Sequence, residues 1–333
     1  MIPRNAQTWQ GQRPSWQQQL TDSVRQAQDL LNILGLENLD VPNIKQFPMR
    51  VPMDFVMRME KNNANDPLLR QVLPLDAEKQ IHPGFSIDPV GDQAASPHQG
   101  IIHKYQGRLL LTLTGACAVH CRYCFRRHYP YSTSNPIKNQ WLQTLNYIRL
   151  HQDLHEVILS GGDPLMLSDE QLADIIRDIA NIPHIRHLRI HSRLPIVLPA
   201  RITHTLCQIL EQSSLTIVMV VHCNHPNELS ENVKQGLRLL HEHNIHLLNQ
   251  SVLLAGVNDD AEVLANLSWR LFNYQVSPYY LHQLDPVQGA AHFQVTPDKA
   301  KQLYQTLQGQ IPGYLLPKFV YEKPGSRYKI NVL

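Results

Sequence analysis

Long apolar runs, a charge excess of one sign and a secretory leader are all absent from this sequence. No apolar run approaches the roughly 18 residues that span a membrane, and residues 1–19 are polar and rich in glutamine, unlike a signal peptide. Lys and Arg number 30 against 28 Asp and Glu, so the formal net charge is only +2. Proteins that bind nucleic acids or anionic membranes usually carry a larger basic excess. We therefore expect a cytoplasmic globular protein with no nucleic-acid or membrane partner.

Cysteine is scarce, at five residues, but three of the five fall in the short stretch C-x3-C-x2-C formed by Cys117, Cys121 and Cys124. Such spacing favours a shared ligand over chance. A closed zinc site takes four ligands, whereas three thiolates around a four-iron cluster leave one iron open to a non-protein ligand. The sequence therefore indicates a metal site with a free position. We expect Cys207 to be a packing thiol, and Cys223, which is near the site but outside the motif, not to be a ligand.

Residues 1–102 differ in pattern from the rest of the chain. Apolar residues recur at helical spacing between positions 20 and 34, and a second short helix is indicated around 52–61. Prolines and glycines then interrupt the chain too often for one long element. We expect 1–102 to be a helical extension that wraps a main domain of residues 103–333.

Short apolar runs alternate with amphipathic segments from residue 107 onward. The runs that we predict as strands are residues 108–114, 156–160, 187–191, 215–222, 246–252, 276–282 and 317–321. Helix start signals lie between them, namely the capping box of Ser168 with Gln171, and Thr296 before Pro297. Repeated strand–helix units imply a parallel sheet, in a full barrel, a partial barrel or a doubly wound sheet. In each case ligands bind at the carboxyl ends of the strands.

Polar residues follow or end several of these predicted strands. Residues 160–163 read Ser-Gly-Gly-Asp, 191–193 read His-Ser-Arg, 222–226 read His-Cys-Asn-His-Pro and 249–251 read Asn-Gln-Ser. Any one of them alone is explained by a turn or a helix cap. Together, and with the cysteines after the first strand, they predict a binding site at one edge of the sheet.

The combination resembles the radical S-adenosylmethionine (SAM) enzymes, and within them the lysine 2,3-aminomutases. The resemblance runs from about residue 103 to the end of the chain. Its longest motifs are Cys117-x3-Cys-x2-Cys-Phe-Arg-Arg, Ser192-Arg193-x-Pro-x-Val-Leu-Pro, Asn224-His-Pro-Asn-Glu228, Asn249-Gln-Ser-Val-Leu-Leu-x-Gly-Val-Asn258 and Pro324-Gly-x3-Lys329-Ile330. It implies an α/β fold, a partial (β/α)6-type parallel barrel of the radical SAM kind.

The resemblance implies three cofactors. Cys117, Cys121 and Cys124 would bind a 4Fe-4S cluster whose open iron chelates S-adenosyl-L-methionine. The residues implied to contact SAM are Ser160, Gly161, Gly162, Asp163, Ser192, His222 and Gln250. Pyridoxal 5'-phosphate (PLP) would form an internal aldimine with Lys329, because only a primary amine can form this Schiff base. Its phosphate would bind Arg108, with Lys104 nearby as a helper.

Substrate contacts are implied in the same way. Arg126 would pair with the carboxylate of the substrate, while Asp285 and Glu322 would hold the distal ammonium of lysine. The family usually has the shorter aspartate where this chain has Glu322. Two acids without a counter-ion in a partly dry pocket would disfavour glutamate as a substrate.

The implied activity is that of an isomerase, a lysine 2,3-aminomutase that converts L-α-lysine to β-lysine through a 5'-deoxyadenosyl radical and a PLP aldimine. An electron donor such as a flavodoxin or ferredoxin would reduce the cluster. The chain ends at Leu333, four residues after Lys329, and this short form resembles the branch that makes (R)-β-lysine for a separate enzyme that modifies translation elongation factor P. Two alternatives remain: a radical SAM enzyme for a different amino acid, and a non-enzymatic zinc-binding module.

Overall fold

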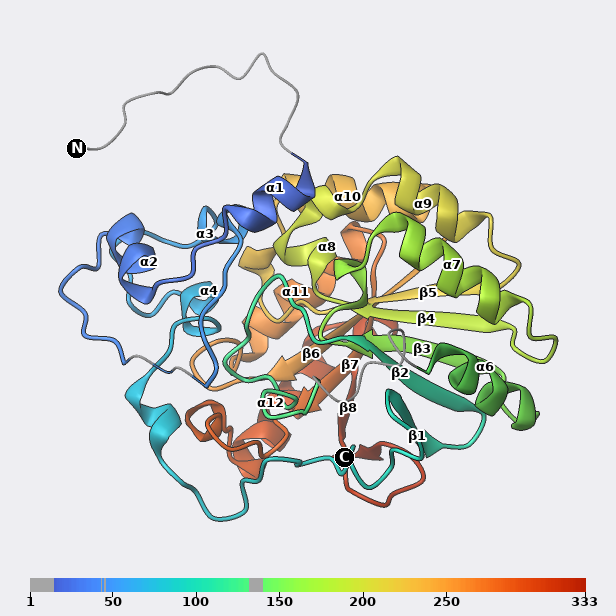
Figure 1. The fold of residues 1–333 in the computed structure, drawn as a ribbon. Coiled ribbons are helices and arrows are strands. Elements are labelled where there is room, and N and C mark those ends of the chain that lie inside the picture. The colour runs from blue at the N-terminus through green and yellow to red at the C-terminus, as the bar shows by residue number, and fades with distance from the viewer. Residues whose placement is uncertain (1–14, 43, 45, 132–139) are drawn as a thin grey trace.

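The computed structural model describes residues 15–42, 44, 46–131 and 140–333. Residues 1–14, part of the polar stretch expected not to be a signal peptide, lie outside the described residues. The described residues form one sheet of nine strands, and neighbouring strands in the sheet follow one another along the chain (Figure 1). The strands are β1 Ile101–Tyr105, β2 Arg108–Thr114, β3 Glu156–Gly161, β4 His187–Ser192, β5 Thr216–Val221, β6 His246–Leu253, β7 Ser277–Gln283, β8 Lys318–Tyr321 and β9 Ile330–Asn331.

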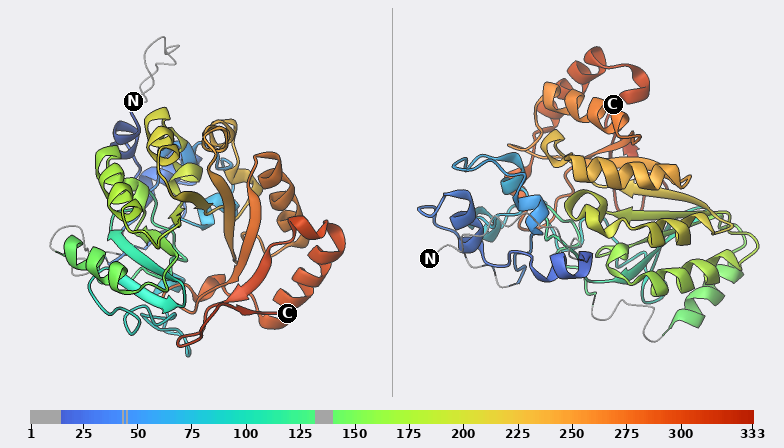
Figure 2. Two further views of the ribbon diagram at one scale, coloured as in Figure 1. Left: turned by 90° about the vertical axis from the view of Figure 1, so that its right-hand side faces the viewer. Right: turned by 90° about the horizontal axis from the view of Figure 1, so that it is seen from above.

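Strands β2 to β8 are parallel, and the short strands β1 and β9 pair antiparallel at the two edges. A helix follows each strand from β2 to β7, and these helices lie on the outer side of a curved sheet (Figure 2). They are α6 Trp141–Leu150, α7 Asp169–Ala180, α9 His204–Glu211, α10 Glu231–Glu242, α11 Ala261–Asn273 and α12 Pro297–Gln310. A doubly wound sheet reverses its strand order, and the sequential order observed here excludes it. Because β1 and β9 are edge strands, the sheet is an open, partial barrel, as predicted.

Local sequence explains these elements. Strand β2 buries Leu109, Leu111 and Leu113 at every second position, the period of two of a covered sheet face, and Thr112 between them is buried as well. The expected capping box of Ser168 and Gln171 begins α7, and α12 begins at Pro297 after Thr296. The seven predicted strands match β2 to β8 within two residues, whereas the edge strands β1 and β9 were not predicted. Cys207 is buried inside α9, as expected of a packing thiol.

The N-terminal segment packs at the end of the barrel where the parallel strands finish (Figure 1). Its helices are α1 Trp16–Thr21, α2 Ala27–Leu34, α3 Met53–Val56 and α4 Pro67–Arg70. The helical periodicity over 20–34 does not produce one helix, because Val24 leaves it to form a β-bridge with Val51. One hydrophobic core cluster includes residues from both sides of the predicted boundary, from Trp16 to Val276, and β1 crosses residue 102. The division into 1–102 and 103–333 therefore stays a prediction.

In the part of the chain that the structure describes, no helix has the length and apolarity needed to cross a membrane.

Candidate active site

A cavity of about 130 Å³ lies within the curve of the sheet. Eight of the residues singled out from the sequence line it: Lys104, Arg108, Arg126, Ser160, His222, Gln250, Glu322 and Lys329. These residues come from both ends of the chain and from several strands, so folding brings together what the sequence keeps apart.

The segment that holds Cys117, Cys121 and Cys124, which we call the cysteine loop, follows β2 and packs beside this cavity. Burial first, and then the neighbouring Cys124, raises the pKa of Cys117 well above its ordinary value. Burial and Cys121 together raise the pKa of Cys124 to about 11. Neighbouring thiols therefore contribute to the raised pKa values of Cys117 and Cys124, and cationic iron at this loop would oppose these shifts by favouring the thiolates. Among the described residues no three Cys, His, Asp or Glu side chains form a preformed group for a metal ion.

The Ser-Gly-Gly-Asp turn packs directly on the cysteine loop. The backbone nitrogen of Asp163 donates to the carbonyl of Ala116 at 2.8 Å. A Cβ on Gly162 would lie 2.4 Å from that same carbonyl oxygen, and Gly161 has a φ of +116°, which favours glycine. The two glycines are thus explained by close contact between two loops at the carboxyl ends of β2 and β3.

Asp163 and Ser192 contact each other rather than lining the cavity. Both carboxylate oxygens of Asp163 accept from Ser192 Oγ, at 2.8 and 3.0 Å. The same carboxylate accepts from the backbone nitrogens of Leu165 at 3.0 Å and Arg193 at 2.8 Å. Burial raises the pKa of Asp163 to about 6 in spite of these hydrogen bonds. In this structure the pair ties the loop after β3 to the loop after β4, and the predicted contacts of both residues with SAM stay predictions.

His222 faces a second histidine that sequence reasoning did not select. Its Nε2 lies 3.4 Å from Nδ1 of His191 on β4, and both rings line the cavity. Burial, followed by Arg193 and Arg126, lowers the pKa of His222 to about 4. Burial and His222 lower the pKa of His191 well below its ordinary value. Both rings are therefore neutral near pH 7.

An alternating series of charges crosses the cavity. Arg126 Nε contacts Asp92 Oδ2 at 2.7 Å, and Lys104 Nζ contacts Asp92 Oδ1 at 2.6 Å. Lys104 Nζ also contacts Glu322 Oε1 at 2.7 Å, and Lys329 Nζ contacts Glu322 Oε2 at 2.6 Å. Asp92 was missed because it lies in a proline- and glycine-rich segment that only the fold brings to the site.

Lys104 therefore has different partners from those predicted. Its ammonium binds Asp92, Glu322 and the carbonyl of Val90, the last at 2.8 Å. An ammonium has three donors, so this structure leaves none for a phosphate. The role of Lys104 as a phosphate helper stays a prediction, and the contacts favour a role in positioning the two acids.

One end of the cavity is cationic and contains Arg108 and Arg189. Arg108 stacks 4.7 Å from the ring of Tyr105, and Arg189 pairs with Glu156 on the neighbouring strand. Burial raises the pKa of Tyr279 to about 12, although both guanidinium groups act to lower it. The two arginines thus lie near the same tyrosine, and Arg189 is a cavity residue that the sequence reasoning missed because mid-strand charge alone indicates no site.

The two acids predicted to hold a distal ammonium differ in protonation. Burial, reinforced by Glu322, raises the pKa of Asp285 to about 7. Burial acts to raise the pKa of Glu322 as well, but the ammonium groups of Lys329 and Lys104 hold it at about 2. Asp285 is not among the residues that line the cavity, yet it feels the charges of Glu322 and Lys329. The two acids are therefore neighbours, and only one of them has cations in contact.

Comparison with known proteins agrees with this geometry. Residues 111–267 match the Radical SAM superfamily. The chain is 48% identical over 322 residues to the L-lysine 2,3-aminomutase of Escherichia coli K12, covering 95% of this chain and 94% of that protein. The chain belongs to the radical SAM lysine 2,3-aminomutase family.

A second L-lysine 2,3-aminomutase shares less of its sequence with this chain. The L-lysine 2,3-aminomutase of Clostridium subterminale is 33% identical over 323 residues, which cover 96% of this chain and 77% of that protein. A solved radical SAM methyltransferase from Sphaerobacter thermophilus has a TM-score of 0.46 and 16% identity, covering 66% of this chain and 68% of that one. Members of the family are isomerases that use a 4Fe-4S cluster, SAM and PLP.

Proposed function

We propose that this chain converts L-α-lysine to β-lysine in the cavity described above, with Lys329 and the cysteine loop serving one site. The observation that carries the proposal is the convergence of an amine, Lys329, with a cation, Arg126, and an acid, Glu322, on one cavity. The amine suits PLP, the cation suits a carboxylate, and the acid suits an ammonium. An α,ω-diamino acid presents these last two groups.

The cysteine loop is the proposed place of the cluster, with Cys117, Cys121 and Cys124 each giving one thiolate. The proposed SAM contacts lie at the carboxyl ends of β3 to β6, next to this loop, and are Ser160, Gly161, Gly162, Asp163, Ser192, His222 and Gln250. Ser160, His222 and Gln250 line the cavity directly. The two glycines and the Asp163–Ser192 pair act by holding the loops in register.

Lys329 is the proposed covalent attachment of PLP, with Arg108 and Arg189 as the cationic end for its phosphate. Bound here, the cluster and SAM would supply a radical that removes hydrogen from the substrate, and PLP would supply the π system across which nitrogen migrates. The chain's own part is to orient these groups and keep water out. Glu322, 2.6 Å from Lys329 Nζ, holds that amine in place when it is free.

Substrate recognition follows from charge. Arg126 is the proposed partner of the substrate carboxylate, and its guanidinium is fixed by Asp92 at 2.7 Å and by Ser160 Oγ at 3.1 Å. Asp285 and Glu322 are the proposed partners of the distal ammonium. A glutamate substrate would bring a third carboxylate to this end of the site, which electrostatics oppose.

The product is proposed to be (R)-β-lysine, used in the cytoplasm by a separate enzyme that modifies translation elongation factor P. A flavodoxin or ferredoxin is the proposed electron donor. The chain is 48% identical to the Escherichia coli relative and 33% identical to the Clostridium relative, which supports grouping it with the former.

Anaerobic incubation of L-lysine with the reconstituted protein, SAM, PLP and a reductant tests this proposal. We expect β-lysine, and chiral chromatography should identify the (R) enantiomer. L-Glutamate should give no product under the same conditions. Absence of β-lysine from an iron-loaded, PLP-loaded protein would contradict the proposed substrate, whereas formation of the (S) enantiomer would contradict only the proposed branch.

A further inference from the structure

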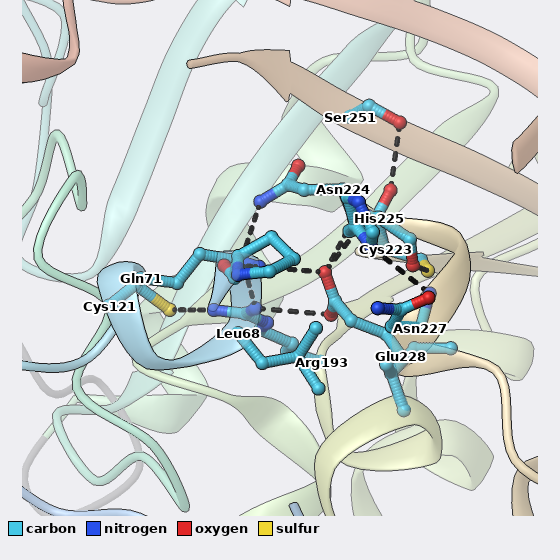
Figure 3. Close-up of polar contacts among 12 residues, drawn as sticks. Leu68, Gln71, Cys121, Arg193, Cys223, Asn224, His225, Asn227, Glu228 and Ser251 are labelled. Atoms are coloured by element: carbon cyan, nitrogen blue, oxygen red, sulfur yellow. Dashed lines mark hydrogen bonds and ion pairs between the residues drawn. The ribbon is translucent and has the colours of Figure 1, made fainter. Parts of the chain in front are cut away.

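A buried network of polar side chains lies behind the cysteine loop, and the reaction outlined above assigns it no role. It consists of Gln71, Arg193, Asn224 and Glu228, and it ends on the sulfur of Cys121 (Figure 3). We call it the sulfur network. Its four members are at most 5% exposed. Three of them lie in the motifs that carry the family resemblance, while Gln71 comes from the N-terminal segment.

Arg193 is the centre of the sulfur network. Its Nη1 donates to Cys121 Sγ at 2.6 Å, and its Nη2 donates to Gln71 Oε1 at 2.7 Å and to Glu228 Oε2 at 3.2 Å. The guanidinium carbon lies 5.5 Å from the ring centre of Tyr123. Because the guanidinium is a planar fork, one edge can contact sulfur while the other is anchored. A lysine ammonium has all its donors on one nitrogen, so it could not span the distance between sulfur and carboxylate as the two edges of a guanidinium do.

Glu228 is held rigidly and in turn fixes the arginine. Its Oε1 accepts from the backbone nitrogens of Asn224 at 2.9 Å and His225 at 3.1 Å, and from Gln71 Nε2 at 3.1 Å. A buried carboxylate in this position requires a counter-ion, which Arg193 supplies. The backbone oxygen of Gln71 also accepts from the backbone nitrogen of Arg122 at 2.9 Å, so the network holds the cysteine loop at two points.

We propose that Arg193 is a positioning residue that orients Cys121 and raises the reduction potential of the iron–sulfur cluster on the cysteine loop. The inference rests on the proposed function, since it requires that these cysteines bind the cluster. Reduction adds one negative charge to the cluster. N–H donors and positive charge close to its sulfurs stabilise that more negative state. The Nε–H of Arg193 is buried without a hydrogen-bond partner among the described residues, which leaves one further donor of this guanidinium for a bound group.

A second buried arginine shows what a purely structural role looks like. Arg201 is fully buried and pairs with Asp169 at 2.8 Å. Its other donors bind the backbone carbonyls of Leu165 and Leu167, at 2.7 and 3.2 Å, and none binds a cysteine of the loop. Arg201 is therefore a control, because replacing it removes a buried cation and leaves the half-buried carboxylate of Asp169 without its partner, while none of the contacts named above involves the cysteine loop.

An anaerobic redox titration of the reconstituted full-length chain, followed by the EPR signal of the reduced cluster, tests the proposal. Replacement Arg193→Met should make reduction about tenfold less favourable, the factor expected for one hydrogen bond to a charged group, which is about 59 mV for one electron. The double variant Arg193→Met with Glu228→Gln should keep a shift to lower potential, which separates the lost N–H donor from the unpaired carboxylate. Arg201→Met should keep the potential of the unchanged protein. Equal potentials for all four proteins would overturn the proposal.

A spectroscopic measurement on the unchanged protein covers the case in which a variant folds poorly. Arginine labelled with 15N only in its guanidinium group should give a 15N coupling to the reduced cluster in pulsed EPR. Arg193→Lys should abolish the coupling, and Arg201→Lys should retain it. A reduced cluster without any such coupling would overturn the role of Arg193. Failure of the unchanged protein to take up a cluster at all would instead overturn the proposed function.

Discussion

Asp285 should make the binding of lysine depend on pH. Burial and the nearby Glu322 raise the pKa of Asp285 to about 7, so it loses its charge as the pH falls through neutrality. The proposed role of Asp285 requires the ionised form. Substrate binding should therefore be strong above pH 7 and weaken below it, since the ammonium of lysine must displace a proton at low pH.

The size of this effect follows from the fraction of Asp285 that is ionised. With a pKa of about 7, about one eleventh is ionised at pH 6 and about ten elevenths at pH 8, so the dissociation constant should be about tenfold larger at pH 6. The neighbouring Glu322 and three histidines keep their charge state in this interval. Burial acts to raise the pKa of Glu322, but the two nearby lysines outweigh it and hold this pKa at about 2. Burial lowers the pKa of His222 to about 4. Burial also lowers the pKa of His191 and of His282 well below the ordinary value.

Calorimetric titration of L-lysine into the PLP-loaded protein would measure how the dissociation constant changes with pH. SAM is left out so that no radical forms and the substrate is not turned over. Asp285→Asn should bind more weakly at pH 8 and should show a nearly flat profile between pH 6 and 8. L-Norleucine has the same chain without the distal amine, so any pH dependence from the α-amine appears in that control. If lysine and norleucine lost affinity in parallel, or if Asp285→Asn kept the tenfold change, the assignment of Asp285 would be wrong.

Other predictions concern the loops that build the site. Gly162→Ala would place a Cβ 2.4 Å from a backbone oxygen of the cysteine loop, and we expect a loss of about 1–3 kcal/mol in urea denaturation together with lower iron content. Gly313→Ala, where nothing lies within 4 Å, should change neither. Glu78→Ala leaves two buried arginines without their shared carboxylate, and should cost about 3–5 kcal/mol. The neighbouring exposed pair gives the control, since Asp76→Ala should cost at most about 1 kcal/mol. A Glu78 variant as stable as the Asp76 variant would refute the argument.

The sequence was sufficient for the parallel strand–helix units because the strands are short apolar runs with helix signals between them, whereas the partial barrel was implied only by the family resemblance. The same periodicity was misleading near Val24, where a β-bridge to Val51 competes with helix formation. Sequential strand order could not be read from periodicity, because a doubly wound sheet has the same local pattern. Edge strands β1 and β9 pair on one side only and are too short to give a clear alternation.

Candidate site residues could be predicted where a motif names them, as for Lys329 and the cysteines. Asp92 and Arg189 could not, because their importance comes from partners far away in the sequence. Gln71 is the clearest case, since it contacts Arg193 across 122 positions of sequence separation. Lys104 was expected to help bind a phosphate because it lies near Arg108 in the sequence, and in the structure its ammonium contacts two acids.

The most direct test of the central claim compares the unchanged protein with Lys329→Ala under the same anaerobic conditions, with L-lysine, SAM, PLP and reductant. Lys329 is half-buried, so the substitution should leave the fold and the iron content unchanged. We predict β-lysine from the unchanged protein, and neither β-lysine nor covalently bound PLP from the variant. Undiminished formation of β-lysine by Lys329→Ala would contradict the claim that this amine and the cysteine loop serve one site.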